Sequence, residues 1–202
     1  MFLENNLSHS KSGGCIEVVT GSMFSGKTEE LIRRIRRAEI AKQNVGIYKP
    51  EIDNRYSDKD VVSHDSKAIS AMPVKSAKEI IELAENNEVV GIDEAQFFED
   101  DLIEVCNHLA NSGKRVIVAA LDMDFTGKPF GPLPQLLSIA EYVTKVHAIC
   151  MRCGNLANYS HRLSDTKKLV MLGETDTYEP LCRSCYIKAF EDKNKEPELF
   201  ND

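Results

Sequence analysis

The chain has 202 residues, of which 42% are hydrophobic and 28% charged, so we expect an ordinary globular protein with one sizeable core and room for a small second domain. Its net charge of −7 argues against a nucleic acid as the main partner, because such binding depends on clustered Lys and Arg. A membrane span is not expected, since no stretch approaches about 18 uninterrupted apolar residues. The polar start lacks a secretion signal, which favours a cytoplasmic protein.

The first predicted elements are a strand and a helix. Residues 1–14 are polar and are expected to form a flexible leader. The β-branched run Cys15–Val19 predicts a buried strand, and apolar residues recur at helical spacing from Thr28 to Gln43. Glu29 and Glu30 lie three or four residues before the first two arginines of this predicted helix, and such pairs are typical of a solvated face. We therefore expect its four arginines on a solvated face and assign them no function; they are Arg33, Arg34, Arg36 and Arg37.

The next segment has weaker signals. Val45–Tyr48 is a second strand candidate, which we expect to stop at Pro50. Residues 53–71 show no persistent period and many polar side chains, which favours a surface loop. A short helix is expected over Ala77–Ala84.

Two further strands follow, each ending in an acidic residue. Val89–Ile92 precedes Asp93, and Val116–Leu121 precedes Asp122, with a helix predicted between them over Asp101–Ser112. Strands and helices that alternate at these lengths predict a three-layer α/β domain with a mostly parallel sheet. Near Lys145 the pattern changes to cysteine pairs and turns, so we expect a domain boundary there.

The turn after the first strand carries a phosphate-binding signature. Gly-x-x-x-x-Gly-Lys-Thr between a strand and a helix fits the Walker A pattern, in which backbone N–H groups and the helix N-terminus hold phosphate oxygens. Lys27 is expected to reach the β- and γ-phosphates of ATP, and the Thr28 hydroxyl to bind Mg²⁺. The predicted phosphate-binding residues of this loop are Gly21, Ser22, Met23, Phe24, Ser25, Gly26, Lys27 and Thr28.

The acidic pair Asp93-Glu94 complements the loop. A strand-end Asp is placed to hold Mg²⁺, and Glu94 would point to the other side of an extended chain, which makes it a candidate general base. The same pair would serve an ATPase, with Glu94 orienting water, or a kinase, with Glu94 accepting a proton from a hydroxyl group. Phe97 and Phe125 follow two strand ends and are expected either to flank a planar ring or to belong to the core.

Four cysteines form two Cys-x-x-Cys pairs separated by 28 residues. Cys150, Cys153, Cys182 and Cys185 supply four thiolates, the pattern of a structural Zn²⁺ site without an open coordination position. His147 lies three residues before the first pair, but a complete set of four cysteines makes it unnecessary as a ligand.

The sequence resembles the type II thymidine kinase family. The likeness is carried by the Walker A loop, the run Asp93-Glu94-Ala95-Gln96-Phe97-Phe98, the run Val118–Asp122 and the cysteine pairs, and it extends from about Ile16 to Tyr186. It implies a P-loop (RecA-like) fold and transfer of the ATP γ-phosphate to the 5′-hydroxyl of thymidine or deoxyuridine. It implies that Glu94 is the base and that Asp93, Ala95 and Gln96 complete the nucleotide site.

The resemblance also predicts the nucleoside site. The loop between the cysteine pairs resembles the lasso of that family, which closes over the nucleoside through main-chain groups, and residues 53–56 resemble a flexible segment near the phosphates. The residues implied to contact the nucleoside are Met23, Phe97, Leu121, Phe125, Ser160, Leu169, Val170, Met171, Leu172, Gly173 and Tyr178.

The expected organisation follows from both lines of argument. We expect a kinase domain over residues 15–145, a zinc-binding and lasso domain over 146–190, and a flexible tail over 191–202. The resemblance implies a homotetramer inhibited by thymidine triphosphate. Two alternatives remain open: a zinc-containing ATPase that moves on DNA, and a nucleotide kinase with a zinc-held lid.

Overall fold

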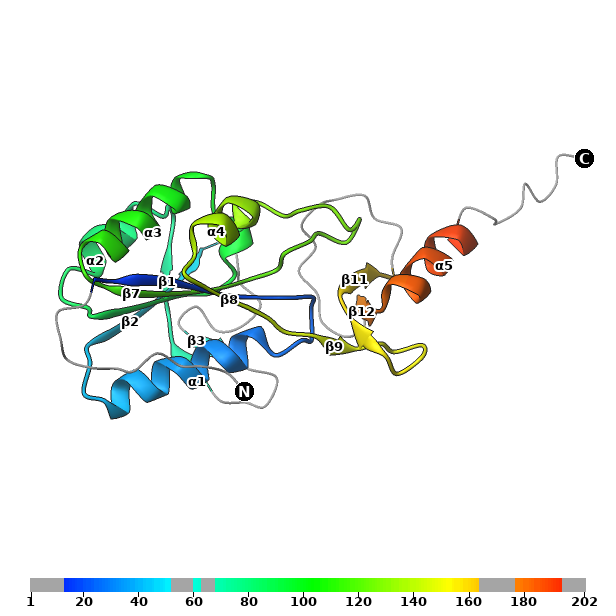
Figure 1. The fold of residues 1–202 in the computed structure, drawn as a ribbon, viewed down its shortest axis with the longest axis horizontal. Coiled ribbons are helices and arrows are strands. Elements are labelled where there is room, and N and C mark those ends of the chain that lie inside the picture. The colour runs from blue at the N-terminus through cyan, green and yellow to red at the C-terminus, as the bar shows by residue number, and fades with distance from the viewer. Residues whose placement is uncertain (1–12, 52–59, 63–67, 164–176, 194–202) are drawn as a thin grey trace, which may run out of the picture.

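The computed structural model describes residues 13–51, 60–62, 68–163 and 177–193 of the chain (Figure 1). These residues form a layered α/β body and a smaller C-terminal unit at one end of it. Most of the expected leader and tail lies outside the described residues. No helix within the described ranges has the length and apolar character needed to cross a membrane.

The body is built on a sheet of six strands in the order β5-β2-β6-β7-β1-β8. Every pair of neighbouring strands is parallel, which confirms the predicted α/β class with a mostly parallel sheet. Parallel strands end at a common edge, so the loops after β1, β6 and β7 lie together. The strands are β1 (Cys15–Thr20), β2 (Val45–Pro50), β5 (Met72–Val74), β6 (Val89–Ile92), β7 (Arg115–Ala120) and β8 (Tyr142–Lys145).

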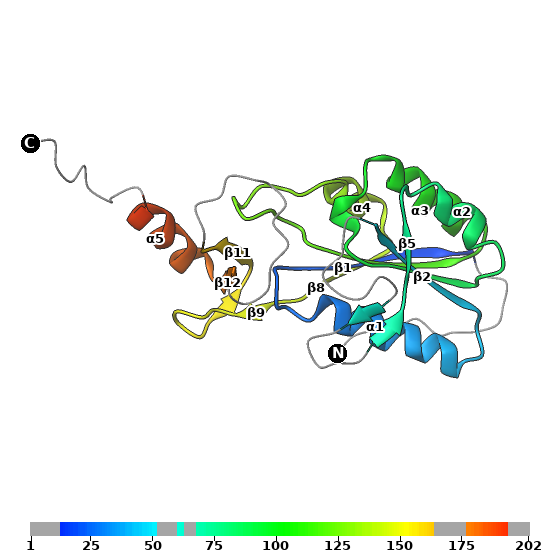
Figure 2. The same cartoon turned by 180° about the vertical axis from the view of Figure 1, so that it is seen from behind.

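Helices cover both faces of this sheet (Figures 1 and 2). On one face α1 (Lys27–Ile40) buries an apolar stripe that includes Leu31 and Ile35. On the other face lie α2 (Glu79–Leu83), α3 (Asp101–Asn111) and α4 (Leu133–Ile139), with a larger apolar core beneath them. The two cores fix the sheet, and with it the edge where the strand-end residues gather.

Two boundaries differ from the sequence prediction. α1 ends at Ile40 and does not reach Gln43. β2 extends two residues beyond the predicted Tyr48 and ends at Pro50, where the stop was expected. Pro50 lacks an N–H on the side that faces β6, but pairing with β6 has already ended at Tyr48, so the proline removes no hydrogen bond there. On the other side pairing with β5 continues, because the Glu51 N–H donates to the Val74 carbonyl at 2.9 Å.

The predicted loop over residues 53–71 contains two short antiparallel strands, β3 (Asp60–Val62) and β4 (Ala68–Ser70). This corrects the prediction of an unstructured loop, because strands of three residues are too short to show a period in the sequence. Residues 53–56 lie outside the described residues. α2 lies within its predicted range, and β6, α3 and β7 agree with theirs to within one residue at each end.

The C-terminal unit has its own small core. Two antiparallel strand pairs precede a final helix, and Tyr159, Leu181 and Tyr186 are buried between them. The helix includes residues 191–193, which were expected to belong to the tail. The elements are β9 (Ala148–Ile149), β10 (Leu156–Ala157), β11 (Tyr159–Arg162), β12 (Tyr178–Leu181) and α5 (Arg183–Lys193).

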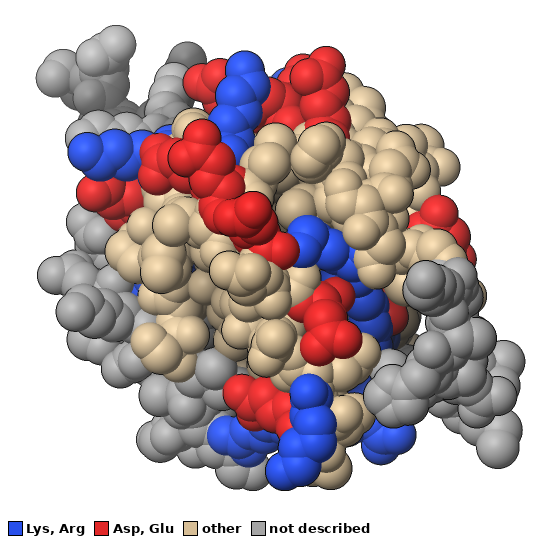
Figure 3. Space-filling model, turned by 90° about the vertical axis from the view of Figure 1, so that its left-hand side faces the viewer, with Lys and Arg blue, Asp and Glu red and all other residues tan. Residues whose placement is uncertain are grey.

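The end of the molecule opposite this unit, where the strands begin, carries charged side chains of both signs. Figure 3 shows Lys and Arg interspersed with Asp and Glu on that face, around an uncharged area. Charges mixed in this way are typical of a solvated surface.

Arg34 contradicts the prediction that all four arginines of α1 lie on a solvated face. It is 5% exposed, and its guanidinium binds Glu17 of β1 at 2.6 Å and Glu30 of α1 at 2.8 Å. Arg115 of β7 binds the other oxygen of Glu17 at 2.6 Å. These charges fasten α1 to the centre of the sheet, and spacing along α1 alone did not reveal them because Glu17 and Arg115 come from other elements.

Replacement of Arg34 by Met tests this cluster. Removing one partner leaves Glu17 and Glu30 under-compensated in a buried place, so we expect a loss of about 3 kcal/mol in the free energy of unfolding, measured by urea denaturation. Arg36→Met, on the exposed side of the same helix, is the matched control and should change that free energy by less than about 0.5 kcal/mol. Equal stabilities of the two variants would contradict a stabilising role for the cluster.

Candidate active site and metal centre

The loop between β1 and α1 has the backbone form expected for phosphate binding. Gly21 and Gly26 have φ values of 152° and 86°, which few other residues adopt. A Cβ on Gly21 would lie 2.2 Å from the Val146 carbonyl oxygen, so the loop needs glycine there for close approach as well. Among the described residues no side chain caps α1, and the N-terminus of a helix that follows a glycine loop favours anion binding.

Lys27 begins α1 and folds back over the loop. Its ammonium donates to the Ser22 carbonyl at 2.7 Å, and the Ser25 hydroxyl donates to the same oxygen at 2.7 Å. The lysine therefore lies against the loop whose N–H groups would surround a phosphate, and a phosphate there would compete with Ser22 for its ammonium.

The same loop is attached to the C-terminal unit. The Met23 N–H donates to the Ser160 hydroxyl at 2.9 Å, and the Ser22 hydroxyl donates to the Ala157 carbonyl at 3.5 Å. Phe24 packs against the core of the unit. Ser160 and Met23, which the sequence assigned to one nucleoside pocket, thus lie together.

Asp93 faces the loop across the strand ends. The Thr28 hydroxyl donates to the Asp93 carboxylate at 3.3 Å, and Asp93 is 5% exposed. A hydroxyl and a carboxylate held this close at a phosphate loop are the oxygen ligands that suit Mg²⁺. The residues therefore fit a magnesium ion, with Thr28 and Asp93 holding it either directly or through water.

Glu94 follows directly, in a conformation that the sequence did not predict. β6 ends at Ile92 and Glu94 has a left-handed φ of 51°, so the chain turns here and is not extended. The argument from strand alternation for the direction of Glu94 is therefore wrong. The turn is instead set by the 3-10 helix η1 (Ala95–Phe97), which Glu94 caps.

Gln96 holds the Glu94 carboxylate in place. Its amide nitrogen donates to Glu94, and its amide oxygen accepts the Leu121 N–H at 2.9 Å. Gln96 is 2% exposed and so has a fixed orientation between β6 and β7. The sequence placed Gln96 at the nucleotide; in the structure its described contacts are with Glu94 and Leu121.

The aromatic residues predicted for the nucleoside lie in two places. Phe97 is partly buried, and its ring makes an edge contact with Phe130 at 5.7 Å. Phe125 lies in the loop between β7 and α4, which reaches toward the C-terminal unit (Figures 1 and 2), and its carbonyl accepts the Tyr186 hydroxyl at 2.8 Å. Leu169–Gly173 lie outside the described residues.

Two charged features of this region were not assigned from sequence. The carboxylate of Asp122, at the end of β7, binds the Lys145 ammonium at 2.6 Å across the end of β1. Arg162 of β11 is 3% exposed and contacts both Phe125 and Tyr178. No local sequence pattern predicts these contacts, because the partners belong to unrelated motifs. Asp122 and Lys145 are 23 residues apart, and Arg162 and Tyr178 are 16 residues apart.

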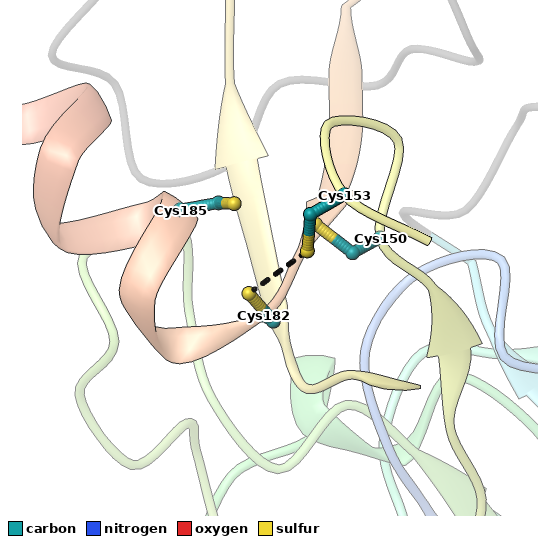
Figure 4. Close-up of side chains that lie close together, drawn as sticks. All are labelled: Cys150, Cys153, Cys182 and Cys185. Carbon is teal, nitrogen blue, oxygen red and sulfur yellow. Dashed lines mark hydrogen bonds between the residues drawn. The ribbon is translucent and has the colours of Figure 1, made fainter. Parts of the chain in front are cut away.

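The four predicted metal-binding cysteines form one cluster. Their sulfur atoms all lie within 4.8 Å of one another, and those of Cys153 and Cys182 are 3.6 Å apart (Figure 4). His147 is not part of the cluster, and its ring binds the Asn158 side chain. Four converging thiols fit a structural Zn²⁺ ion.

The thiols of this cluster differ in acidity. Burial opposes ionisation of Cys150, but backbone N–H groups at Cys182, Arg152 and Cys153 outweigh it and lower the pKa of Cys150 to about 6. Hydrogen bonds with Cys153 and Cys182 raise the pKa of Cys185 to about 12. Zn²⁺ binds thiolates, so its binding at this cluster would release protons.

Comparisons with known proteins give a consistent result. The family model for thymidine kinase matches residues 14–186. The thymidine kinase of Bacteroides thetaiotaomicron is 59% identical over 189 residues, which cover 94% of this chain and 95% of the relative. The thymidine kinase of a Rhodothermus species is 59% identical over 180 residues, which cover 89% of this chain and 84% of the relative.

Likeness to solved structures is more distant. The flagellar accessory protein FlaH from Methanocaldococcus jannaschii has a TM-score of 0.48 and 16% sequence identity, covering 72% of this chain and 76% of that one. A likeness at this level carries no argument about function.

The metal centre gives a direct prediction. We expect purified protein to contain one Zn²⁺ per chain, and Cys153→Ser to lose most of it in the presence of a competing chelator, because three thiolates hold the ion more weakly than four. Cys106→Ala is the control, since Cys106 is a fully buried thiol of α3 outside the cluster. Metal analysis checks both variants, and equal zinc content in the two would contradict the assignment.

Proposed function

The chain belongs to the thymidine kinase family and is a nucleoside kinase, and we propose that Glu94 is its general base and that the loop Gly21–Thr28 holds the donor phosphates. The observation that carries this proposal is the meeting of the phosphate loop, Asp93 and Glu94 at one edge of the sheet, with Thr28 and Asp93 3.3 Å apart. A base beside the transferred phosphate is what a kinase needs in order to accept a proton from the attacking hydroxyl.

The proposed reaction is an in-line transfer. Glu94 accepts the proton of the thymidine 5′-hydroxyl as its oxygen forms a bond to the γ-phosphorus of ATP. The bond from that phosphorus to the β–γ bridging oxygen breaks, which leaves ADP and thymidine monophosphate. Gln96 keeps the Glu94 carboxylate oriented for this step through the contact described above.

The donor side relies on the loop and the metal ligands. Lys27 leaves the Ser22 carbonyl for the β- and γ-phosphates, where its charge offsets the negative charge that develops during transfer. Thr28 and Asp93 would hold Mg²⁺, which would neutralise charge at the phosphates when bound. Gly21–Gly26 contribute backbone N–H groups, and Ala95 lies in the turn that places Glu94.

The acceptor side is proposed between the loop and the C-terminal unit. Met23, Phe97, Leu121, Phe125, Ser160 and Tyr178 would line the base, and Leu169–Gly173 would close over it through main-chain atoms. The hydrogen bond from the Met23 N–H to the Ser160 hydroxyl supports this proposal, because it joins the loop that would hold ATP to the unit that would hold the nucleoside. Deoxyuridine, which lacks only the base methyl group, is proposed as a second acceptor.

A homotetramer in the cytoplasm, inhibited by thymidine triphosphate, is proposed on the family alone. The absence of a nucleic-acid or membrane partner is proposed on the net charge of −7 and on the lack of a long apolar stretch. The proposed division into a kinase domain over 15–145 and a zinc and lasso domain over 146–190 is supported by the end of β8 at Lys145 and by the separate core of the C-terminal unit.

Replacement of Glu94 by Gln tests the base. The amide keeps the size of the side chain but does not accept the proton, so we expect kcat to fall by about 10² to 10⁴ while ATP affinity stays nearly unchanged. Glu99→Gln, an exposed neighbour beyond η1, should retain full turnover. Steady-state kinetics and ATP titration check both variants, and unchanged turnover in Glu94→Gln would remove Glu94 from this role.

An acceptor panel tests the substrate. We expect ATP turnover to depend on thymidine and deoxyuridine, to be weaker with deoxycytidine, and to be indifferent to thymidine monophosphate and single-stranded DNA. Product chromatography identifies the monophosphate that is formed. Turnover that DNA stimulates and thymidine does not would favour a DNA-dependent ATPase, and a preference for monophosphates would favour a nucleotide kinase.

A further inference from the structure

Arg162 ends β11 and is the most deeply buried charged side chain of the C-terminal unit among the described residues, at 3% exposure. Burial of a guanidinium is costly unless its N–H groups and its planar faces find partners. The proposed reaction uses Arg162 in no step, so its burial requires an explanation of its own.

One partner of Arg162 is the ring of Phe125. The guanidinium carbon lies 3.7 Å from the centroid of that ring, a distance at which a cation and an aromatic face attract each other. Phe125 is also held through its backbone, since Tyr186 of α5 donates to its carbonyl at 2.8 Å. The ring of a loop residue is thereby fixed from two elements of the C-terminal unit.

A second partner is the hydroxyl of Tyr178, the first residue of β12. It accepts Nε–H and Nη2–H of Arg162 at 3.1 and 2.6 Å, and the two residues face each other in the β11–β12 pair. Tyr178 is 7% exposed. Arg162 and Tyr178 therefore form the last pair of the strand ladder before the chain leaves for residues 164–176.

We propose that Arg162 is a positioning residue of the nucleoside pocket, which sets Phe125 and Tyr178 in one fixed arrangement around the base. One rigid, planar group contacts a residue from the loop after β7 and a residue from β12 at the same time. A flat guanidinium can stack on a ring while its edge donates two hydrogen bonds, and a lysine ammonium cannot do both.

The inference rests on the proposed acceptor site and adds a residue that decides its shape. Arg162 acts through Phe125 and Tyr178, so its loss should weaken the contacts of these two residues with the nucleobase and leave the phosphate loop unchanged. Thymidine binding should weaken, whereas ATP binding should not. A merely structural role would affect both substrates together with the stability of the fold.

The experiment compares Arg162→Lys and Arg162→Met with the unaltered protein. We expect the KM for thymidine to rise about ten- to a hundredfold in both variants, because small displacements of positioning groups have effects of this size, while the KM for ATP stays within about twofold. The double variant Arg162→Lys, Tyr178→Phe should lose no more than Arg162→Lys alone if the two residues act as a unit. Isothermal titration with thymidine separates binding from turnover.

Arg183→Lys is the matched control, because the exposed Arg183 also lies over a ring in this unit, that of Tyr159 at 5.1 Å, yet contacts neither Phe125 nor Tyr178 in the described structure. It should leave both KM values unchanged. Zinc content and thermal unfolding are measured for every variant. A thymidine KM within twofold of the unaltered protein in Arg162→Lys would overturn the inference. Equal losses for both substrates, with a lower unfolding temperature, would also overturn it.

These results are distinguishable from a failure of the proposed function. If the unaltered protein does not phosphorylate thymidine, the function itself is wrong, whatever the variants do. If it does and the Arg162 variants behave like Arg183→Lys, the function stands and only the positioning role is lost.

Discussion

The hydrogen bond from the Met23 N–H to the Ser160 hydroxyl, 2.9 Å long, joins the two halves of this molecule. Met23 belongs to the phosphate loop, whose shape depends on glycines, and Ser160 belongs to a strand of the C-terminal unit. In the proposed function the phosphate loop holds ATP and the C-terminal unit lines the nucleoside, so this contact would help to keep the two substrates aligned. Phe24 and Ser22 reinforce it from neighbouring positions of the same loop.

The cysteine cluster has a corresponding role at the other end of the unit. Cys182 directly precedes α5 and Cys185 lies in its first turn, and the next residue, Tyr186, donates a hydrogen bond to the carbonyl of Phe125. A metal ion that fixes the start of α5 would therefore also restrain the loop after β7, through the hydrogen bond from Tyr186 to Phe125. Tyr186 also stacks on Tyr159 with ring centroids 4.3 Å apart, which ties that helix to β11. A zinc ion bound by the four cysteines would thus support the proposed nucleoside pocket without contacting the reacting atoms.

Much of this arrangement could be predicted from the sequence, and what could not has a common cause. The Walker A loop, Asp93-Glu94 and the cysteine pairs are local patterns whose spacing follows directly from their chemistry, so their places could be read from the chain. Arg34 and Arg162 could not, because a buried charge is recognised by partners that come from distant strands. The conformation of Glu94 was misjudged for a related reason, because where the chain turns after a strand depends on contacts with other elements. Local rules locate a motif, and tertiary contacts decide how its side chains point.

The ion cluster around Arg34 has a consequence for the direction of the phosphate-binding groups. Apolar side chains such as Ile35 hold α1 against the sheet, but a smooth stripe alone resists rotation of a helix about its own axis only weakly. Glu17 binds Arg34 of α1 and Arg115 of β7 at the same time, which opposes this rotation. Arg34 lies seven residues from the start of the helix, roughly 10 Å along its axis. The ion cluster in the middle of the helix therefore sets the angle at which the first-turn N–H groups meet a phosphate, although the cluster is remote from the phosphate itself.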